Sequence, residues 1–182
     1  MTPMKVDDLL LRKVHPVVRP PVCTLVNRVA LELGISLRVF DTYRDGVAQD
    51  AAFAAGASKK KAGQSWHNLT LADGTPAAFA VHVGVELPTL GLIGFGKSLL
   101  EPPGAVRVWA DVWDNKVGTR LTAEQLVLAA VGLKAEEIGF VAGMRWRMLQ
   151  DWCHVEWHPN GAPLEEVRAV LAAQGTIGGL RT

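Results

Sequence analysis

The 182-residue sequence contains only two cysteines, Cys23 and Cys153, and they form no recognisable motif. A disulfide framework of the kind that stabilises small secreted domains is therefore not indicated. The sequence also lacks an excess of either charge, because its positive and negative residues nearly cancel to a formal net charge of +1 at pH 7. Domains that bind nucleic acid usually have a clear basic excess, so the composition argues against that class of partner. The one run of like charge, Lys59-Lys60-Lys61, is interpreted as a solvated loop.

The sequence also lacks a long apolar run. No stretch reaches the length needed to cross a bilayer, and residues 1–18 contain Asp7 and Asp8 but no apolar signal core. We therefore expect a protein that is made in the cytoplasm without a signal peptide and does not insert stably into a membrane. Because 49% of the residues are hydrophobic, a chain of this length is expected to form one domain with its own core. We expect that domain to be a monomer.

Hydrophobic periodicity predicts a mixture of helices and strands. The helices are expected over residues 6–14, 21–33, 46–55, 121–133 and 164–174. The strands are expected over residues 35–40, 78–85 and 106–112. Residues 87–103 are rich in glycine and proline and are interpreted as an irregular excursion that could form a lid over a cleft.

Residues 150–158 concentrate two histidines, two acidic residues and two tryptophans in nine positions. A strand would place His154, Glu156 and His158 on one face, whereas a helical turn would bring Asp151 beside His154. Imidazoles and carboxylates serve both as metal ligands and as general bases. The plain alternative is a hydrophobic strand with polar edges. Cys153 is interpreted as a small buried hydrophobic residue.

Further candidates for such chemistry lie in separate segments. Arg44 is in a polar turn, Ser65 and His67 are two residues apart, and His82 interrupts an apolar strand. A lone histidine on such a strand is more often a hydrogen-bonded core residue, but this one has potential partners. A metal-dependent peptidase requires protein ligands, an open ligand position, a carboxylate base and a cation near the developing oxyanion. These residue types are all present.

Taken together, these motifs resemble a family of zinc peptidases. The family includes D-alanyl-D-alanine carboxypeptidases and dipeptidases and the L-alanyl-D-glutamate endopeptidases, among them many phage endolysins. The resemblance covers residues 37–157. It rests on Tyr43-Arg44 followed by Gln49, Ser65-Trp66-His67-Asn68, Gly143-x-Arg145-Trp146, and Asp151-Trp152-Cys153-His154-Val155-Glu156-Trp157. It implies a single α+β domain over residues 1–182, with a small antiparallel sheet flanked by helices and a zinc cleft. Residues 1–36 would be an N-terminal helical region, and residues 160–182 would contain the C-terminal helix.

The resemblance also implies roles for individual residues. His67 and His154 match two zinc ligands, Asp151 matches the catalytic carboxylate base, and Arg44 matches the arginine that faces the scissile carbonyl. The residues expected to contact substrate are Ser65, Gln49 and Trp66.

One position departs from the family pattern. The middle ligand in the family is an aspartate, and this sequence has His82 at that position. Since imidazole is an acceptable zinc ligand, we expect His82 to be the third ligand, with Asp73 as the alternative.

The resulting hypothesis is a zinc-dependent peptidoglycan peptidase. It would cleave a stem-peptide bond of the L-alanyl-D-glutamate or D-Ala-D-Ala type, and it would reach the cell wall after release from the cytoplasm. If no third ligand is functional, the alternative is a non-catalytic peptidoglycan- or peptide-binding module with a degenerate metal site. Zinc that a chelator removes together with activity would distinguish the two.

Overall fold

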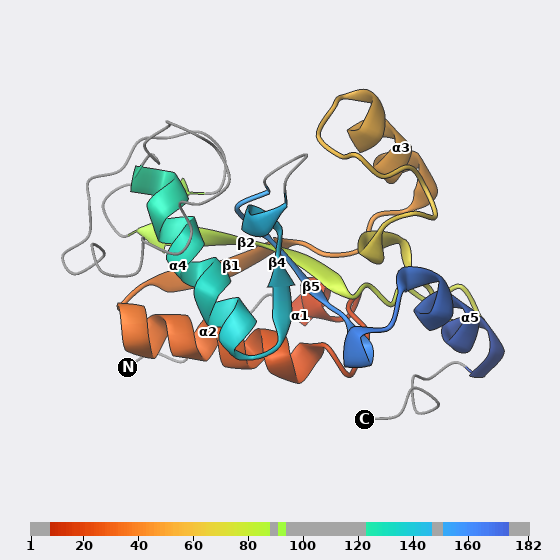
Figure 1. The fold of residues 1–182 in the computed structure, drawn as a ribbon, viewed down its shortest axis with the longest axis horizontal. Helices are drawn as coiled ribbons and strands as arrows, with labels where there is room; N and C mark the ends of the chain where they lie inside the picture. Colours follow the sequence, from red (N-terminus) through yellow and green to blue (C-terminus); the bar gives the residue numbers. More distant parts are fainter. Residues whose placement is uncertain (1–7, 88–90, 94–122, 147–150, 175–182) are drawn as a thin grey trace.

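The computed structural model describes residues 8–87, 91–93, 123–146 and 151–174 (Figure 1). The α-helices are α1 (Asp8–Leu11), α2 (Arg19–Leu33), α3 (Gly46–Ala54), α4 (Ala123–Glu137) and α5 (Leu164–Gln174). The strands are β1 (Ser36–Asp41), β2 (Ala80–Leu87), β3 (Gly91–Ile93), β4 (Phe140–Ala142) and β5 (His154–Trp157). Short 3-10 helices are η1 (Trp66–Asn68), η3 (Gly143–Arg145) and η4 (Pro159–Gly161).

The strands form one antiparallel sheet in the order β1-β2-β5-β4, with β3 also paired to β2. β2 is the central strand. β1 pairs with one of its edges, while β5 pairs with residues 80–82 and β3 with residues 85–87 of the opposite edge. Helices flank this sheet, with α2 along it and α4 crossing near β4 and β5 (Figure 1). The predicted α+β fold with an antiparallel sheet is therefore confirmed.

One face of the sheet forms the main hydrophobic core with α2 and α4. The α2 helix contains Pro20 and Pro21 in its first turn, where a missing backbone N–H costs little. It ends at Leu33 and is capped by Gly34, whose φ of 67° lies in the left-handed region that favours glycine. The buried valines and leucines that face one another in this core are Val22, Leu25, Val26 and Val29 of α2, Val81, Val83 and Val85 of β2, and Val127, Leu128 and Val131 of α4. Alternation along β2 then places His82 on the opposite face.

Most of the predicted elements form where the sequence places them, but two strands were not predicted. β3 lies inside the segment that we interpreted as an irregular excursion, so that interpretation is wrong for residues 91–93. β4 was also missed, because strands of three residues are too short to show periodicity. The remainder of the expected lid and the strand expected over residues 106–112 lie outside the described residues. Among the helices that the structure describes, none has both the length and the apolar character needed to cross a bilayer.

Candidate metal centre

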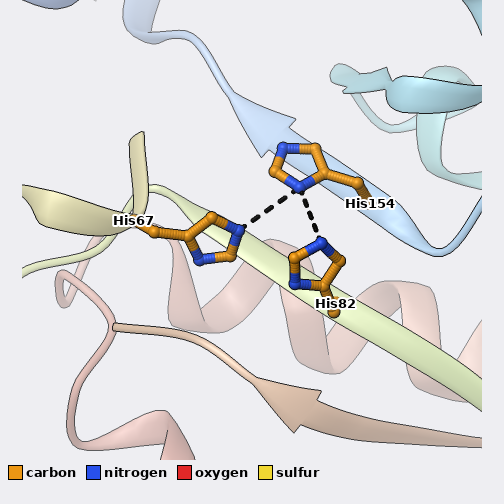
Figure 2. A group of neighbouring side chains, drawn as sticks. All are labelled: His67, His82 and His154. Carbon is orange, nitrogen blue, oxygen red and sulfur yellow. Dashed lines mark hydrogen bonds between the residues drawn. The ribbon is translucent and has the colours of Figure 1, made fainter. Parts of the chain in front are cut away.

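Three histidines from three separate segments converge on the face of the sheet opposite α2 and α4 (Figure 2). His67 lies in η1, His82 in β2 and His154 at the start of β5. The sheet brings two of them together, because His82 is the register partner of His154 in the β2–β5 pair. All three side chains are buried. We refer to His67, His82 and His154 as the three-histidine group.

The ring nitrogens of this group have the spacing of a metal site. The distance from His67 Nε2 to His154 Nδ1 is 3.3 Å, and that from His154 Nδ1 to His82 Nε2 is 3.1 Å (Figure 2). Tetrahedral zinc with Zn–N bonds of about 2.0–2.1 Å places its ligand nitrogens about 3.3–3.4 Å apart. The three-histidine group could therefore bind a metal ion with little rearrangement.

The outward-facing nitrogen of each ring meets an oxygen acceptor. His67 Nδ1 contacts the Thr42 carbonyl oxygen, His154 Nε2 lies 2.9 Å from Glu156 Oε1, and His82 Nδ1 lies 3.2 Å from Asp41 Oδ2. An oxygen acceptor at the outer nitrogen holds the ring proton there and leaves the inner nitrogen with a free lone pair. The inner nitrogens of all three rings face a common point, and each ring can bind a metal in its neutral form. For His82 that form carries no proton on Nε2 for Asp151 Oδ2, which lies 3.1 Å away.

Burial and neighbouring charges determine which of these groups are ionised. Burial, and for His67 the neighbouring histidines, lowers the pKa of His67 and His154, so both rings favour the neutral form. Burial also opposes the charged form of His82, but hydrogen bonds to Asp151 and Asp41 outweigh it and raise the pKa of this ring. In the absence of metal, the ring of His82 therefore has the strongest tendency in the three-histidine group to hold a proton.

Three carboxylates from the described part of the chain lie next to the three-histidine group. Burial alone would raise the pKa of Asp41, Asp151 and Glu156, but hydrogen bonds from the histidine rings lower the pKa of each carboxyl overall. When all three imidazoles are neutral, as they would be as metal ligands, these three carboxylates and the guanidinium of Arg44 leave two net negative charges among the described residues. A divalent cation would balance that charge.

Asp151 lies directly beside the three-histidine group. Its Oδ2 is 3.1 Å from His82 Nε2, and its Oδ1 accepts a hydrogen bond from the Cys153 thiol at 3.1 Å. Residues 152 and 153 form a turn, and β5 begins at His154, so the segment combines the two alternatives that the sequence allowed. Cys153 is buried as expected, and burial followed by the Asp151 charge raises the pKa of its thiol. The thiol therefore stays protonated and orients the carboxylate.

Arg44 reaches the group from the segment that follows β1. Its Nε donates to Asp41 Oδ2 at 2.7 Å, and its Nη2 lies 3.1 Å from His82 Nδ1. Its backbone N–H donates to the His67 carbonyl, and its own carbonyl accepts from the Asn68 side chain at 2.6 Å. These contacts fix the cation next to the segment that contains His67.

The three residues expected to contact substrate have internal contacts instead. Ser65 caps η1 by accepting from the His67 backbone N–H, and Trp66 stacks on His158 with ring centroids 4.4 Å apart. Gln49 is fully buried in α3 and donates to Ser58 Oγ and the Lys60 carbonyl. None of these contacts involves the side chains of the three-histidine group, and substrate contact by Ser65, Gln49 and Trp66 stays a prediction.

Asp73, the alternative third ligand, lies in an exposed turn. Its carboxylate accepts a hydrogen bond from the Thr75 backbone N–H at 2.9 Å. Within the part of the chain that the structure describes, the groups of potential ligands that lie together contain His82 and do not contain Asp73. The geometry therefore favours His82 as the third ligand.

Sequence reasoning missed two neighbours of the three-histidine group. Asp41 lies just beyond the strand expected over residues 35–40, but in the structure it ends β1 opposite His82 after a register shift that follows Val39. Trp146 packs its indole against the His154 ring with centroids 4.7 Å apart. A one-residue shift in strand pairing leaves no signature in the sequence. Trp146 belongs to a motif of the family resemblance, so its position near the site could be expected, but its contact with His154 could not.

Gly143, in the same motif, has a steric role that predicts the effect of one substitution. A Cβ built on Gly143 would lie 2.7 Å from the Asp151 carbonyl oxygen and 3.1 Å from His154 Cβ. We expect Gly143→Ala to displace the turn that holds both residues and to lower the free energy of unfolding by about 1–3 kcal/mol, as overpacking does. Urea denaturation measures this change, and zinc affinity should fall with it.

Gly132→Ala in α4 is the matched control. There the new Cβ would meet the flexible end of Met144, and alanine is favoured over glycine within a helix by about 1 kcal/mol. The control should therefore cost less stability than Gly143→Ala and leave zinc affinity unchanged. Equal unfolding free energy and zinc affinity in Gly143→Ala and the wild type would contradict the steric argument.

Neither the models of known protein families nor the sequences of curated proteins match this chain. Among solved structures, it is similar to the crystal structure of the Serratia marcescens L-Ala D-Glu endopeptidase ChiX, with a TM-score of 0.48 and 20% sequence identity. The similarity covers 87% of this chain and 90% of that chain.

Proposed function

We propose that this chain is a zinc-dependent peptidase that hydrolyses a peptidoglycan stem peptide at an L-alanyl-D-glutamate or D-Ala-D-Ala bond. The observation that best supports metal chemistry is the convergence of three buried ring nitrogens whose opposite nitrogens all meet oxygen acceptors. An all-imidazole ligand set suits zinc and similar transition metals better than magnesium or calcium. The peptidoglycan substrate is supported by the motifs around Arg44, His67, Gly143 and Asp151.

The residues of the chain have distinct roles in this proposal. A zinc ion held by the three-histidine group would polarise the scissile carbonyl and lower the pKa of the attacking water. Asp151 would accept the proton of the attacking water and pass it to the leaving amine, and its carboxyl is ionised, as a general base must be. Arg44 provides positive charge for the developing oxyanion.

Glu156 and His158 support the His154 ring through its outer nitrogen. The two carboxylate oxygens of Glu156 bond separately to His154 Nε2 at 2.9 Å and His158 Nε2 at 2.8 Å. His158 in turn stacks on Trp66, which packs in the hydrophobic core. His154 is thereby anchored to the core through three successive contacts, which limits movement of its ring. We also propose that the protein acts on the cell wall after release from the cytoplasm.

Digestion of purified peptidoglycan tests this function. The zinc-loaded protein should release fragments whose masses and new termini, measured by mass spectrometry, identify one stem-peptide bond. A chelator should stop the release, and zinc added back should restore it. Zinc-loaded protein that binds peptidoglycan but releases no fragment would contradict the proposal and support a non-catalytic binding module.

A further inference from the structure

We infer that Asp41 is a positioning residue that holds His82 and Arg44 through a single carboxylate oxygen. Asp41 Oδ2 lies 3.2 Å from His82 Nδ1, 2.7 Å from Arg44 Nε and 2.5 Å from Arg44 Nη2. The inference rests on the proposed metal site and adds to it a residue that the sequence motifs did not identify. One atom therefore links a proposed ligand to the cation proposed to face the substrate.

A β-bulge places Asp41 where both contacts are possible. β1 and β2 pair regularly as far as Val39 opposite Val83, and the register then shifts so that Asp41 lies opposite His82. Phe40 is the extra residue, and its ring stacks on the His82 ring with centroids 5.8 Å apart. Regular pairing would put Phe40 opposite His82 and turn Asp41 to the other face of the sheet. Bulges redirect side chains in this way beside functional sites.

The charge of Asp41 has two separable effects. Its first effect concerns the metal, because a carboxylate on the outer nitrogen of His82 fixes the tautomer and makes the inner nitrogen a stronger donor. The ligand set is neutral, so this contact brings negative charge near the metal without a carboxylate ligand. Its second effect concerns Arg44, since a guanidinium next to a divalent cation is repelled unless an anion lies between them.

Two substitutions distinguish these effects. Asp41→Ala removes both contacts, and we expect zinc affinity to fall by about 10–100-fold, as it does when other outer-shell partners of metal ligands are removed. Asp41→Asn keeps an oxygen acceptor for His82 but has no charge for Arg44. We therefore expect Asp41→Asn to keep more of the zinc affinity and to lose turnover. Asp45→Asn is the control, because Asp45 caps α3 through the Ala48 backbone N–H.

The test measures zinc affinity by chelator competition, the visible absorption spectrum of the cobalt-substituted protein, and turnover with each variant. We expect a changed cobalt spectrum in Asp41→Ala and wild-type behaviour in Asp45→Asn. If Asp41→Ala does not fold, the nearly isosteric Asp41→Asn tests the inference through turnover and the spectrum. Two results would each overturn this inference and leave the proposed function intact. One is wild-type zinc affinity with an unchanged spectrum in a folded Asp41→Ala protein, and the other is wild-type turnover in Asp41→Asn. A wild-type chain that binds neither metal would overturn the proposed function and this inference with it.

Discussion

Replacing His154 with alanine is expected to remove the bound zinc and abolish peptide hydrolysis. His154 is central to the three-histidine group, because its Nδ1 lies within 3.3 Å of the inner nitrogen of each of the other two rings. Its loss removes a direct ligand and leaves Glu156 without its His154 contact. We expect zinc affinity to fall by more than the roughly 10–100-fold that losing an outer-shell partner costs. His67→Ala should behave in the same way.

His15→Ala is the matched control for this experiment. His15 is also a buried imidazole, but it stacks on Phe79 with ring centroids 4.9 Å apart and has no contact with the three-histidine group among the described residues. It should lose some stability and keep stoichiometric zinc. Elemental analysis of the purified variants measures bound zinc, and a peptidoglycan assay measures activity. Stoichiometric zinc in His154→Ala would refute its assignment as a ligand.

Asp151→Asn is expected to retain zinc and to lower turnover by about 10²–10⁴-fold, the usual contribution of a general base. The amide is nearly the same size as the carboxylate and can still accept from the Cys153 thiol, so the turn before β5 should be preserved. It cannot accept the proton of water, and this step should become limiting. The measurements are zinc content and turnover on a stem-peptide substrate, with Asp73→Asn in the exposed turn as the control.

Turnover near the wild-type value in Asp151→Asn would make Glu156 the candidate base. The geometry argues against Glu156, because both of its oxygens are already bonded to histidine rings. The corresponding Glu156→Gln variant decides between them. Loss of turnover with retained zinc in Glu156→Gln, together with an active Asp151→Asn, would reverse the two roles.

Sequence patterns predicted the parts of the fold that depend on local periodicity. Residues 21–33 have a helical repeat, prolines in the first turn and Gly34 at the end, and all of these features appear in α2. A strand over residues 78–85 puts alternate side chains on opposite faces, and in β2 the valines Val81 and Val83 face the core while His82 joins the three-histidine group. The proximity of His67, His82 and His154 followed from the family resemblance, because no local pattern relates residues so far apart in sequence.

The features that sequence reasoning missed depend on contacts between segments. The position of Asp41 results from a register shift between β1 and β2, which depends on how the two strands pair. The amide of Gln49 is buried against the loop at residues 58–60, so a polar side chain near the site motifs serves as an internal support. The sequence shows that Asp41 and Gln49 are polar, but it does not show which residues they contact in the fold.

The wide spacing of the three histidines along the chain has a consequence for folding. His67 and His154 are 87 residues apart in sequence, and His82 and His154 are 72 residues apart. Zinc bound by all three would join η1, β2 and β5 much as a covalent cross-link would, and the unfolded chain could not maintain that arrangement. Free zinc at 100 times its dissociation constant would add about 2.7 kcal/mol to the stability of the folded state. Zinc supply would thus control how long the protein resists unfolding and proteolysis, separately from its effect on hydrolysis.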